Sequence, residues 1–263
     1  MSSADNLAKL DAIEAALNKR WPENKIEPTL DRISALVDAL GSPQLSYPTI
    51  HLAGTNGKTT TARMIDQLLA NLGYRVGRYT SPHLESFTER ISIKGEPISA
   101  AQMIATYDDI ALYLDLIDSR QPHPISYFEA LTAMAFVAFA EFPVDIAVIE
   151  AGLGGEWDAT NVVSSQVSVM TPIGIDHMEY LGNTLTEIAQ TKSGIFKPES
   201  NVVLAAQSSE AAGALVRYIQ ETLKSGIGHL QVPKPFRSEE KNQSGIAFVS
   251  GLINSILSNH SKI

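Results

Sequence analysis

The sequence contains no cysteine, which excludes disulfides, cysteine zinc sites and a thiol nucleophile. It is also short of positive charge, because 20 Lys and Arg against 29 Asp and Glu leave a net charge of −9, which argues against a nucleic-acid surface. Long apolar runs are missing as well: the longest, Ala130–Ala140, is too short to span a bilayer. The first 20 residues contain no signal-peptide pattern. With 263 residues and 44% hydrophobic content, we expect a cytoplasmic globular protein with no membrane partner.

Strand-like and helix-like segments alternate along most of the chain. Helical spacing or helix-start signals predict helices at 7–17, 30–40, 64–72, 101–117, 126–140 and from residue 184. Runs of β-type residues predict strands at 47–53, 74–79, 144–149, 166–171 and 201–206. Because strands separated by helices form parallel sheets covered on both faces, the pattern predicts an α/β fold with a mostly parallel, P-loop-type sheet. The rhythm ends near Ser225, so we expect one domain over 1–225 and an atypical tail, linker or poorly ordered, over 226–263.

A glycine-rich turn, Gly54-Thr-Asn-Gly-Lys-Thr59, lies between a predicted strand and a predicted helix. A triphosphate needs backbone amides that close around its oxygens, a lysine that reaches the outer phosphates and a hydroxyl that holds Mg²⁺. Gly54, Gly57, Lys58 and Thr59 supply these groups. The usual pattern places its first glycine five positions before the second, where this chain has Leu52. The alternative is a turn that only joins a strand to a helix, but the flanking segments favour a phosphate site.

Acidic and imidazole side chains follow two later predicted strands. Glu150 comes directly after the run Val144–Ile149, where a P-loop enzyme needs a carboxylate for Mg²⁺; the alternative is a solvated strand end. Asp176 and His177 follow the strand at 166–171. His177 could ligate a metal, and Asp176 could orient it or cap a helix instead. Because ligands gather at the carboxyl ends of parallel strands, we expect these groups to lie near the glycine loop.

Several motifs occur in one order and spacing between about Leu30 and Pro198. They are Gly54-Thr-Asn-Gly-Lys58, Thr80-Ser-Pro-His-Leu84, Glu89-Arg-Ile91, Ser126-Tyr-Phe-Glu129, Glu150-Ala-Gly-Leu-Gly-Gly155, Asp158-Ala-Thr-Asn161, Asp176-His177, Leu181-Gly182 and Lys192-Ser-Gly-Ile195. Together they resemble the folylpolyglutamate synthase and dihydrofolate synthase family, ATP-dependent ligases related to the Mur ligases. One departure is Thr59-Thr60, where many members have Gly-Ser and Thr-Thr is more usual in the Mur ligases.

The resemblance implies a ligase that uses ATP and Mg²⁺ to add L-glutamate to a folate or dihydropteroate through an acyl phosphate. By this resemblance the ATP-binding positions are Gly54, Thr55, Asn56, Gly57, Lys58, Thr59 and Thr60. The implied metal positions are Thr59, Ser81, Glu150, His177 and Lys192, of which Lys192 would be carbamylated. The implied catalytic positions are Lys58, His177 and Lys192. The pterin or folate side matches Ser81, Pro82, His83, Phe128, Asp158 and Ala159, although Ser81-Pro82 is also a common turn and Phe128 could be core.

Two other hypotheses stay open. Family members continue into a second α/β domain that supplies the glutamate-binding surface, and nothing after Ser225 resembles it. The chain could therefore be a nucleotide-binding half without ligase turnover. It could also be a UDP-muramyl amino-acid ligase of the Mur type, which only Thr59-Thr60 favours. In every case we expect small-molecule substrates, no nucleic acid and a monomer.

Overall fold

The computed structural model describes residues 3–22, 25, 27–198, 200–222 and 229–231. Within them, eight strands form one sheet in the order β4-β3-β2-β5-β1-β6-β7-β8. The strands are β1 (Thr49–Ala53), β2 (Val76–Tyr79), β3 (Ile91–Ile93), β4 (Glu96–Pro97), β5 (Ile146–Glu150), β6 (Val167–Met170), β7 (Asn201–Leu204) and β8 (His229–Gln231). Strand β3 pairs antiparallel with both β2 and β4 at one edge of this sheet. The expected mostly parallel sheet is confirmed.

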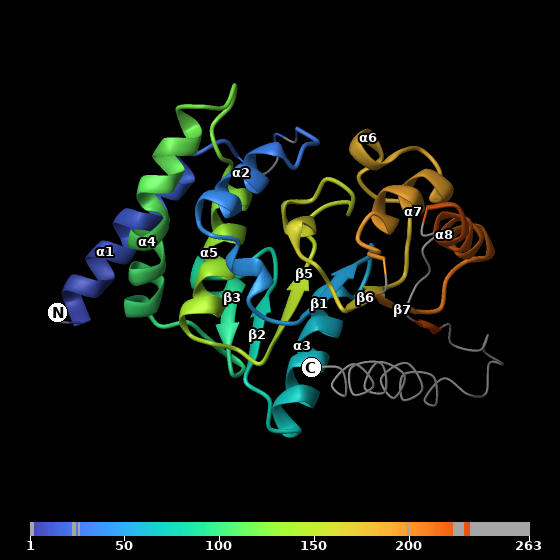
Figure 1. The fold of residues 1–263 in the computed structure, drawn as a ribbon, viewed down its shortest axis with the longest axis horizontal. Helices are drawn as coiled ribbons and strands as arrows, with labels where there is room; N and C mark the ends of the chain where they lie inside the picture. Colours follow the sequence, from blue (N-terminus) through green and yellow to red (C-terminus); the bar gives the residue numbers. More distant parts are fainter. Residues whose placement is uncertain (1–2, 23–24, 26, 199, 223–228, 232–263) are drawn as a thin grey trace.

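Helices cover both faces of this sheet, as the prediction required (Figure 1). They are α1 (Ser3–Asn18), α2 (Asp31–Ala39), α3 (Lys58–Asn71), α4 (Ala100–Asp118), α5 (Tyr127–Glu141), α6 (Met178–Leu181), α7 (Leu185–Ser193) and α8 (Ser209–Thr222), with 3₁₀ turns η1 (Pro43–Leu45), η2 (Phe87–Arg90) and η3 (Ala159–Val162). Helix α3 packs on one face, and α5, α7 and α8 pack on the other. Helices α1, α2 and α4 form a further layer next to α5. Among the described residues, no helix has both the length and the apolar character needed to cross a membrane.

Successive side chains of β5 belong to different cores, because side chains alternate across a sheet. Ala147 and Ile149 pack in the core that contains α5, whereas Val148 packs with α3. Both faces of the strand are therefore buried, which explains its unbroken apolar run. Glu150 follows Val148 by two positions, so its side chain lies on the α3 face at the carboxyl end of the strand.

The helix starts predicted at residues 126 and 184 are confirmed, and each is a capping box. The Ser126 hydroxyl accepts the Glu129 amide at 3.2 Å, and the Glu129 carboxylate accepts the Ser126 amide at 2.7 Å. Glu129 therefore completes the helix cap. The same reciprocal pair joins Thr184 and Glu187 at the start of α7.

The structure differs from the sequence-based boundaries at the ends of several strands. Strand β2 begins at Val76 instead of Tyr74, because the Tyr74 amide donates to Leu69 at the end of α3 and the Arg75 amide donates to Asp145. Strand β8 lies in the segment expected to be a linker, and it pairs parallel with β7. Most of the expected tail over 226–263 lies outside the described residues, and the division of the chain at residue 225 stays a prediction.

Candidate active site

The glycine loop joins the end of β1 to the start of α3. A Cβ atom at Gly54 would lie 1.9 Å from the Thr171 hydroxyl oxygen, and its φ is +144°, so this position requires glycine. The Thr55 and Asn56 amides both donate to the Pro172 carbonyl, at 3.0 and 3.1 Å. The amides that remain for an anion are those of the first turn of α3, which have no acceptor within the helix.

Two lysines share one backbone acceptor at this loop. The Lys58 and Lys192 ammonium groups each donate to the Gly54 carbonyl at 3.1 Å. Lys192 is only 4% exposed. Burial first, and then the positive charge of Lys58, lowers the pKa of Lys192 to about 8, although Asp158 and Asp176 oppose this shift. Lys192 is therefore far more often a neutral amine near pH 8 than an ordinary lysine is.

Glu150 and Thr59 form a buried polar pair beside the lysines. The Thr59 hydroxyl donates to the two Glu150 carboxylate oxygens at 2.9 and 3.0 Å, and the Ser81 amide also donates to this carboxylate. Glu150 is 1% exposed, and burial raises its pKa to about 7 against the opposing effects of Thr59 and Lys58. A carboxylate and a hydroxyl beside free helix amides suit Mg²⁺, which takes few protein ligands together with phosphate oxygens.

The described residues include no group of three His, Asp or Glu side chains close enough to hold a metal by themselves. His177 is half exposed and lies at the N-terminus of α6 with φ of 47°. Its acidic neighbour is Asp176, whose carboxylate accepts the His177 amide at 2.9 Å and lies 3.6 Å from the imidazole Nε2. A metal at Glu150 would therefore need ligands beyond the acidic and imidazole side chains.

A cavity of about 540 Å³ opens beside the glycine loop. The predicted site residues in its lining are Lys58, Ser81, Pro82, Phe128, Asp158, Ala159 and His177. His83 lies apart from this lining, and its Nδ1 accepts a hydrogen bond from the Arg90 guanidinium at 2.9 Å. The fold thus brings Lys58 of the glycine loop and most of the predicted pterin side to one cavity.

The segment between β5 and η3 forms one wall of this cavity, and Asp158 holds its shape. The Asp158 carboxylate accepts the Leu153 amide at 2.8 Å, the Thr160 amide at 3.0 Å, the Thr160 hydroxyl and the Gly152 amide. Gly155 packs so closely on α7 that an added Cβ would lie 2.5 Å from the Lys192 carbonyl oxygen. The segment 152–158 is therefore fixed by its own hydrogen bonds and by contact with the helix that carries Lys192.

Residues 52–228 match the family model described as the Mur ligase middle domain. The chain belongs to the Mur ligase family. A dihydrofolate synthase/folylpolyglutamate synthase of Mycobacterium tuberculosis is 56% identical over 198 residues, which cover 73% of this chain and 41% of that protein. The structure of Mycobacterium tuberculosis folylpolyglutamate synthase complexed with ADP is similar with a TM-score of 0.78 and 49% identity, covering 86% of this chain and 50% of the other.

A second solved structure, E. coli FolC in complex with DHPP and ADP, is similar with a TM-score of 0.74 and 31% identity. The match covers 84% of this chain and 50% of that one. This Mur ligase chain thus spans about half the length, or less, of the relatives it matches.

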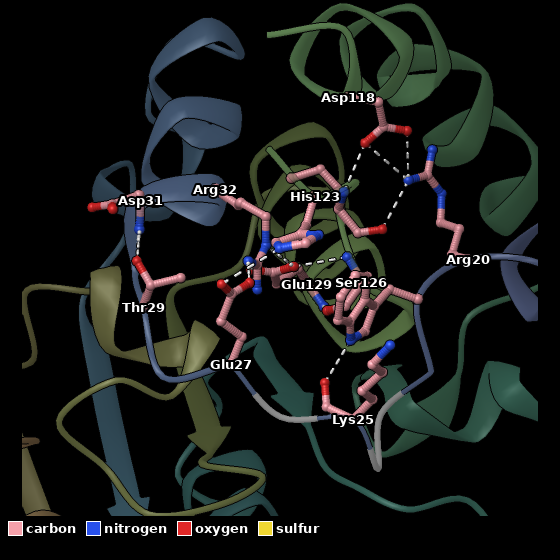
Figure 2. Close-up of polar contacts among 12 residues, drawn as sticks. Arg20, Lys25, Glu27, Thr29, Asp31, Arg32, Asp118, His123, Ser126 and Glu129 are labelled. Atoms are coloured by element: carbon pink, nitrogen blue, oxygen red, sulfur yellow. Dashed lines mark hydrogen bonds and ion pairs between the residues drawn. The ribbon is translucent and has the colours of Figure 1, made fainter. Parts of the chain in front are cut away.

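Sequence reasoning assigned no role to Arg32, which lines the cavity of this Mur ligase domain. Its guanidinium lies between Glu129 and Glu27 (Figure 2), with its Nε 3.1 Å from each Glu129 oxygen. Arg32 and Glu129 are buried, and Glu27 is exposed. A lone arginine at the start of an amphipathic helix suggests a solvated residue. Only the approach of α5 reveals its partner, which is 97 positions away.

Sequence reasoning also assigned no role to two tryptophans at this cavity, one in its lining and one beside a lining residue. Trp157 lies in the lining next to Asp158, and Lys25 of the lining lies over the Trp21 ring, with its ammonium 4.3 Å from the ring centroid. The Trp21 indole donates to the Lys25 carbonyl at 2.6 Å. A tryptophan directly before a recognised Asp-Ala pair was the available signal for Trp157, because aromatic faces commonly line ligand pockets.

Proposed function

We propose that this chain is the ATP-binding part of a ligase that adds L-glutamate to a folate or dihydropteroate through an acyl phosphate. The observation that carries the proposal is the single cavity whose lining includes both Lys58 and the Phe128, Asp158 and Ala159 positions. Formation of an acyl phosphate requires the γ-phosphate of ATP and a substrate carboxylate to lie next to each other. The 56% identity to a protein named dihydrofolate synthase/folylpolyglutamate synthase favours the folate branch over a UDP-muramyl ligase.

In this proposal the glycine loop binds the phosphates of ATP. The first-turn amides of α3 donate to phosphate oxygens, and the helix dipole adds favourable charge. Lys58 leaves the Gly54 carbonyl and pairs with the outer phosphates, because a phosphate oxygen is a stronger acceptor for an ammonium group than a peptide carbonyl. Thr55 and Asn56 act differently: their amides already donate to Pro172, so they hold the loop against the segment after β6.

Glu150 and Thr59 would hold Mg²⁺, with Ser81 nearby. Their fit rests on the Thr59-to-Glu150 hydrogen bonds and on the burial of the carboxylate. When bound, the ion supplies positive charge to the phosphoryl group that is transferred. His177 and Lys192 are the further candidate ligands, His177 from the cavity lining and Lys192 from α7.

The proposed reaction has two steps. A carboxylate oxygen of the pterin substrate attacks the γ-phosphorus of ATP, and ADP leaves. The glutamate amine then attacks the carbonyl carbon of the acyl phosphate, so that an amide forms and phosphate leaves. The contribution of Lys58 is to neutralise charge on the moving phosphoryl group. No protein nucleophile is required, in agreement with a chain that has no cysteine.

Lys192 is proposed to carry a carbamate. Its amine nitrogen would attack the carbon of CO₂ and release a proton, which converts a cation into a carboxylate-like ligand. The lowered pKa of about 8 supports this, because only the neutral amine reacts. The change would also remove the repulsion between two ammonium groups on one carbonyl.

The test is phosphate release by the purified chain with dihydropteroate or a tetrahydrofolate, with and without glutamate. Glutamate-dependent release supports the ligase. ATP binding without release supports the alternative of a nucleotide-binding half, and release only with UDP-muramyl substrates contradicts the folate assignment. Cytoplasmic location, a monomeric state and the absence of a nucleic-acid partner stay predictions.

A further inference from the structure

His51 is a buried imidazole in the middle of the sheet. It lies on β1 between β5 and β6, opposite Ile149 and Ser168, and is 0% exposed. Its Nε2 lies 2.8 Å from the hydroxyl oxygen of Thr160 in η3. The neighbouring positions on β1, Ile50 and Leu52, are apolar core residues. A histidine at this position of a central strand therefore requires an explanation, because apolar side chains pack there without a desolvation cost.

The direction of the hydrogen bonds is determined by Asp158. The Thr160 hydroxyl donates its one proton to the Asp158 carboxylate, so toward His51 the same oxygen can only accept. His51 must therefore carry its proton on Nε2. Burial, followed by the charge of Lys197, lowers the pKa of His51 to about 3, so the ring is neutral and holds this one tautomer. A series of hydrogen bonds, here called the His51 hydrogen-bond series, therefore runs from His51 through Thr160 to Asp158.

The other imidazole nitrogen, Nδ1, makes the His51 hydrogen-bond series partly unfavourable. His51 Nδ1 is buried and has no hydrogen-bond partner among the described residues. Leaving a buried acceptor unpaired is unfavourable, because the atom gives up its hydrogen bond to water without a replacement. A buried polar group of this kind is usually kept for a specific contact, and the one that His51 makes is the Thr160 hydroxyl.

The His51 hydrogen-bond series ends at Asp158, in the wall of the cavity. Asp158 collects the amides of Gly152, Leu153 and Thr160, so its carboxylate sets the path of the segment 152–158. His51 belongs to the strand that reaches Gly54 three positions later. The His51 hydrogen-bond series thus links the strand that precedes the glycine loop to the segment that lines the other part of the cavity.

We propose that His51 is a positioning residue which, through Thr160, holds Asp158 and the segment 152–158 in place for the pterin ligand. The ligand part of this inference rests on the proposed function. His51 does not touch the ligand, and its effect is on the geometry of the wall. Loss of the Thr160 hydroxyl or of the imidazole should loosen the wall and leave the phosphate loop unchanged.

The first experiment measures the Kd of dihydropteroate and of a non-hydrolysable ATP analogue for the full chain. Thr160→Val and His51→Leu should each weaken dihydropteroate binding roughly 10- to 100-fold, the range expected for losing a hydrogen bond that supports a charged group. The Kd of the ATP analogue should change less than about twofold. Thr160→Ser, which keeps the hydroxyl, should restore dihydropteroate binding. Because the contacts act in series, the double variant should be no weaker than Thr160→Val alone.

The second experiment needs no ligand. Hydrogen exchange measured by NMR should show that the Leu153 and Thr160 amides, which donate to Asp158, exchange faster in Thr160→Val and His51→Leu than in the parent or Thr160→Ser. Unchanged exchange at these amides overturns the inference, and so does a parallel loss of affinity for both ligands. A parent chain that binds no dihydropteroate would contradict the proposed function, while faster exchange in the variants would still support the positioning role.

Discussion

The two sides of the cavity use their polar groups in opposite ways. On the nucleotide side, Lys58 and Lys192 rest on one weak acceptor, the Gly54 carbonyl, and the first-turn amides of α3 have no acceptor within their helix. On the opposite wall, the polar groups are paired with one another. The Asp158 carboxylate accepts hydrogen bonds from its own segment, and Arg32 lies between Glu129 and Glu27.

This difference indicates two modes of recognition. A side whose ammonium groups donate to a neutral carbonyl, and whose first-turn amides have no acceptor within their helix, favours binding of an anion by charge with little change in the surrounding fold. A wall whose carboxylates already accept hydrogen bonds or ion pairs from neighbouring protein groups depends more on its shape than on its charge for binding. Substitutions on the first side should therefore reduce affinity, whereas substitutions on the second should first reduce stability.

The largest effect is expected at the Arg32 and Glu129 pair. Arg32→Met leaves the buried Glu129 carboxylate without its ion-pair partner, which should lower the free energy of unfolding by about 3–5 kcal/mol. Glu129→Gln should cost less, because Arg32 keeps its ion pair with Glu27. Urea unfolding measures this. Arg120→Met, at an exposed arginine after α4, is the matched control and should change stability by less than about 0.5 kcal/mol. Equal stability of Arg32→Met and the control would remove the distinction between the two sides.

Lys58→Ala tests the nucleotide side. We expect ATP affinity to fall by roughly 10- to 100-fold, because a charged hydrogen-bond donor to phosphate is lost, while the unfolding temperature stays within a few degrees of the parent. Calorimetric titration and thermal unfolding measure the two quantities. Lys9→Ala, at an exposed lysine of α1, is the control and should alter neither. An unchanged ATP affinity in Lys58→Ala would contradict the phosphate-binding role of the loop.

Gly155→Ala tests the contact between the cavity wall and α7. The added Cβ would meet the Lys192 carbonyl at 2.5 Å, so the backbone must move, at a cost of about 1–3 kcal/mol. Gly213→Ala in α8 is a matched control, because its nearest neighbour would be the end of the Arg217 side chain at 3.6 Å. Helix propensity should make this control more stable by about 0.5–1 kcal/mol. Denaturant midpoints that move in the same direction in both variants would argue against a tightly packed wall.

The smallest effect is expected for the pH dependence of CO₂ uptake by the Lys192 amine. Its folded-state pKa is lowered to about 8, so the neutral fraction grows as the pH rises through that value. Uptake of isotopically labelled CO₂, followed by carbon NMR, should therefore be clearly greater at about pH 9 than at about pH 7. Lys192→Arg should abolish the signal. Uptake at Lys192 that begins only at the higher pH typical of exposed lysines would show that the loop does not activate this amine.

Local patterns in the sequence predicted much of the fold. The unbroken apolar run before Glu150 indicated a strand buried on both faces, and the spacing from Ser126 to Glu129 indicated a helix start. Both signals operate within a few residues, so they do not depend on what packs against them. The predicted ends of the strands were less accurate. Strand β2 starts later than predicted because the Arg75 amide donates to the Asp145 carboxylate, which is 70 positions away.

The candidate site was only partly accessible from sequence. Lys58, Thr59 and Glu150 could be assigned because a phosphate loop and a strand-end acid have recognisable spacing, and the Thr59-to-Glu150 contact agrees with that expectation. Arg32 and His51 could not be assigned in this way. Each makes its important contact with a residue that only the packing of a distant element brings near, 97 and 109 positions away.

The sequence by itself determined the alternation of strands and helices, the glycine loop and the membership of a family whose residues are recognisable in order. These depend on local periodicity and on short spacings, which a chain keeps whatever its neighbours are. Only the tertiary structure decided which polar groups are still available to a ligand. Two lysines meet on the Gly54 carbonyl, and Asp158 collects the donors of its own segment, because hydrogen-bond partners are decided by distance in space rather than along the chain.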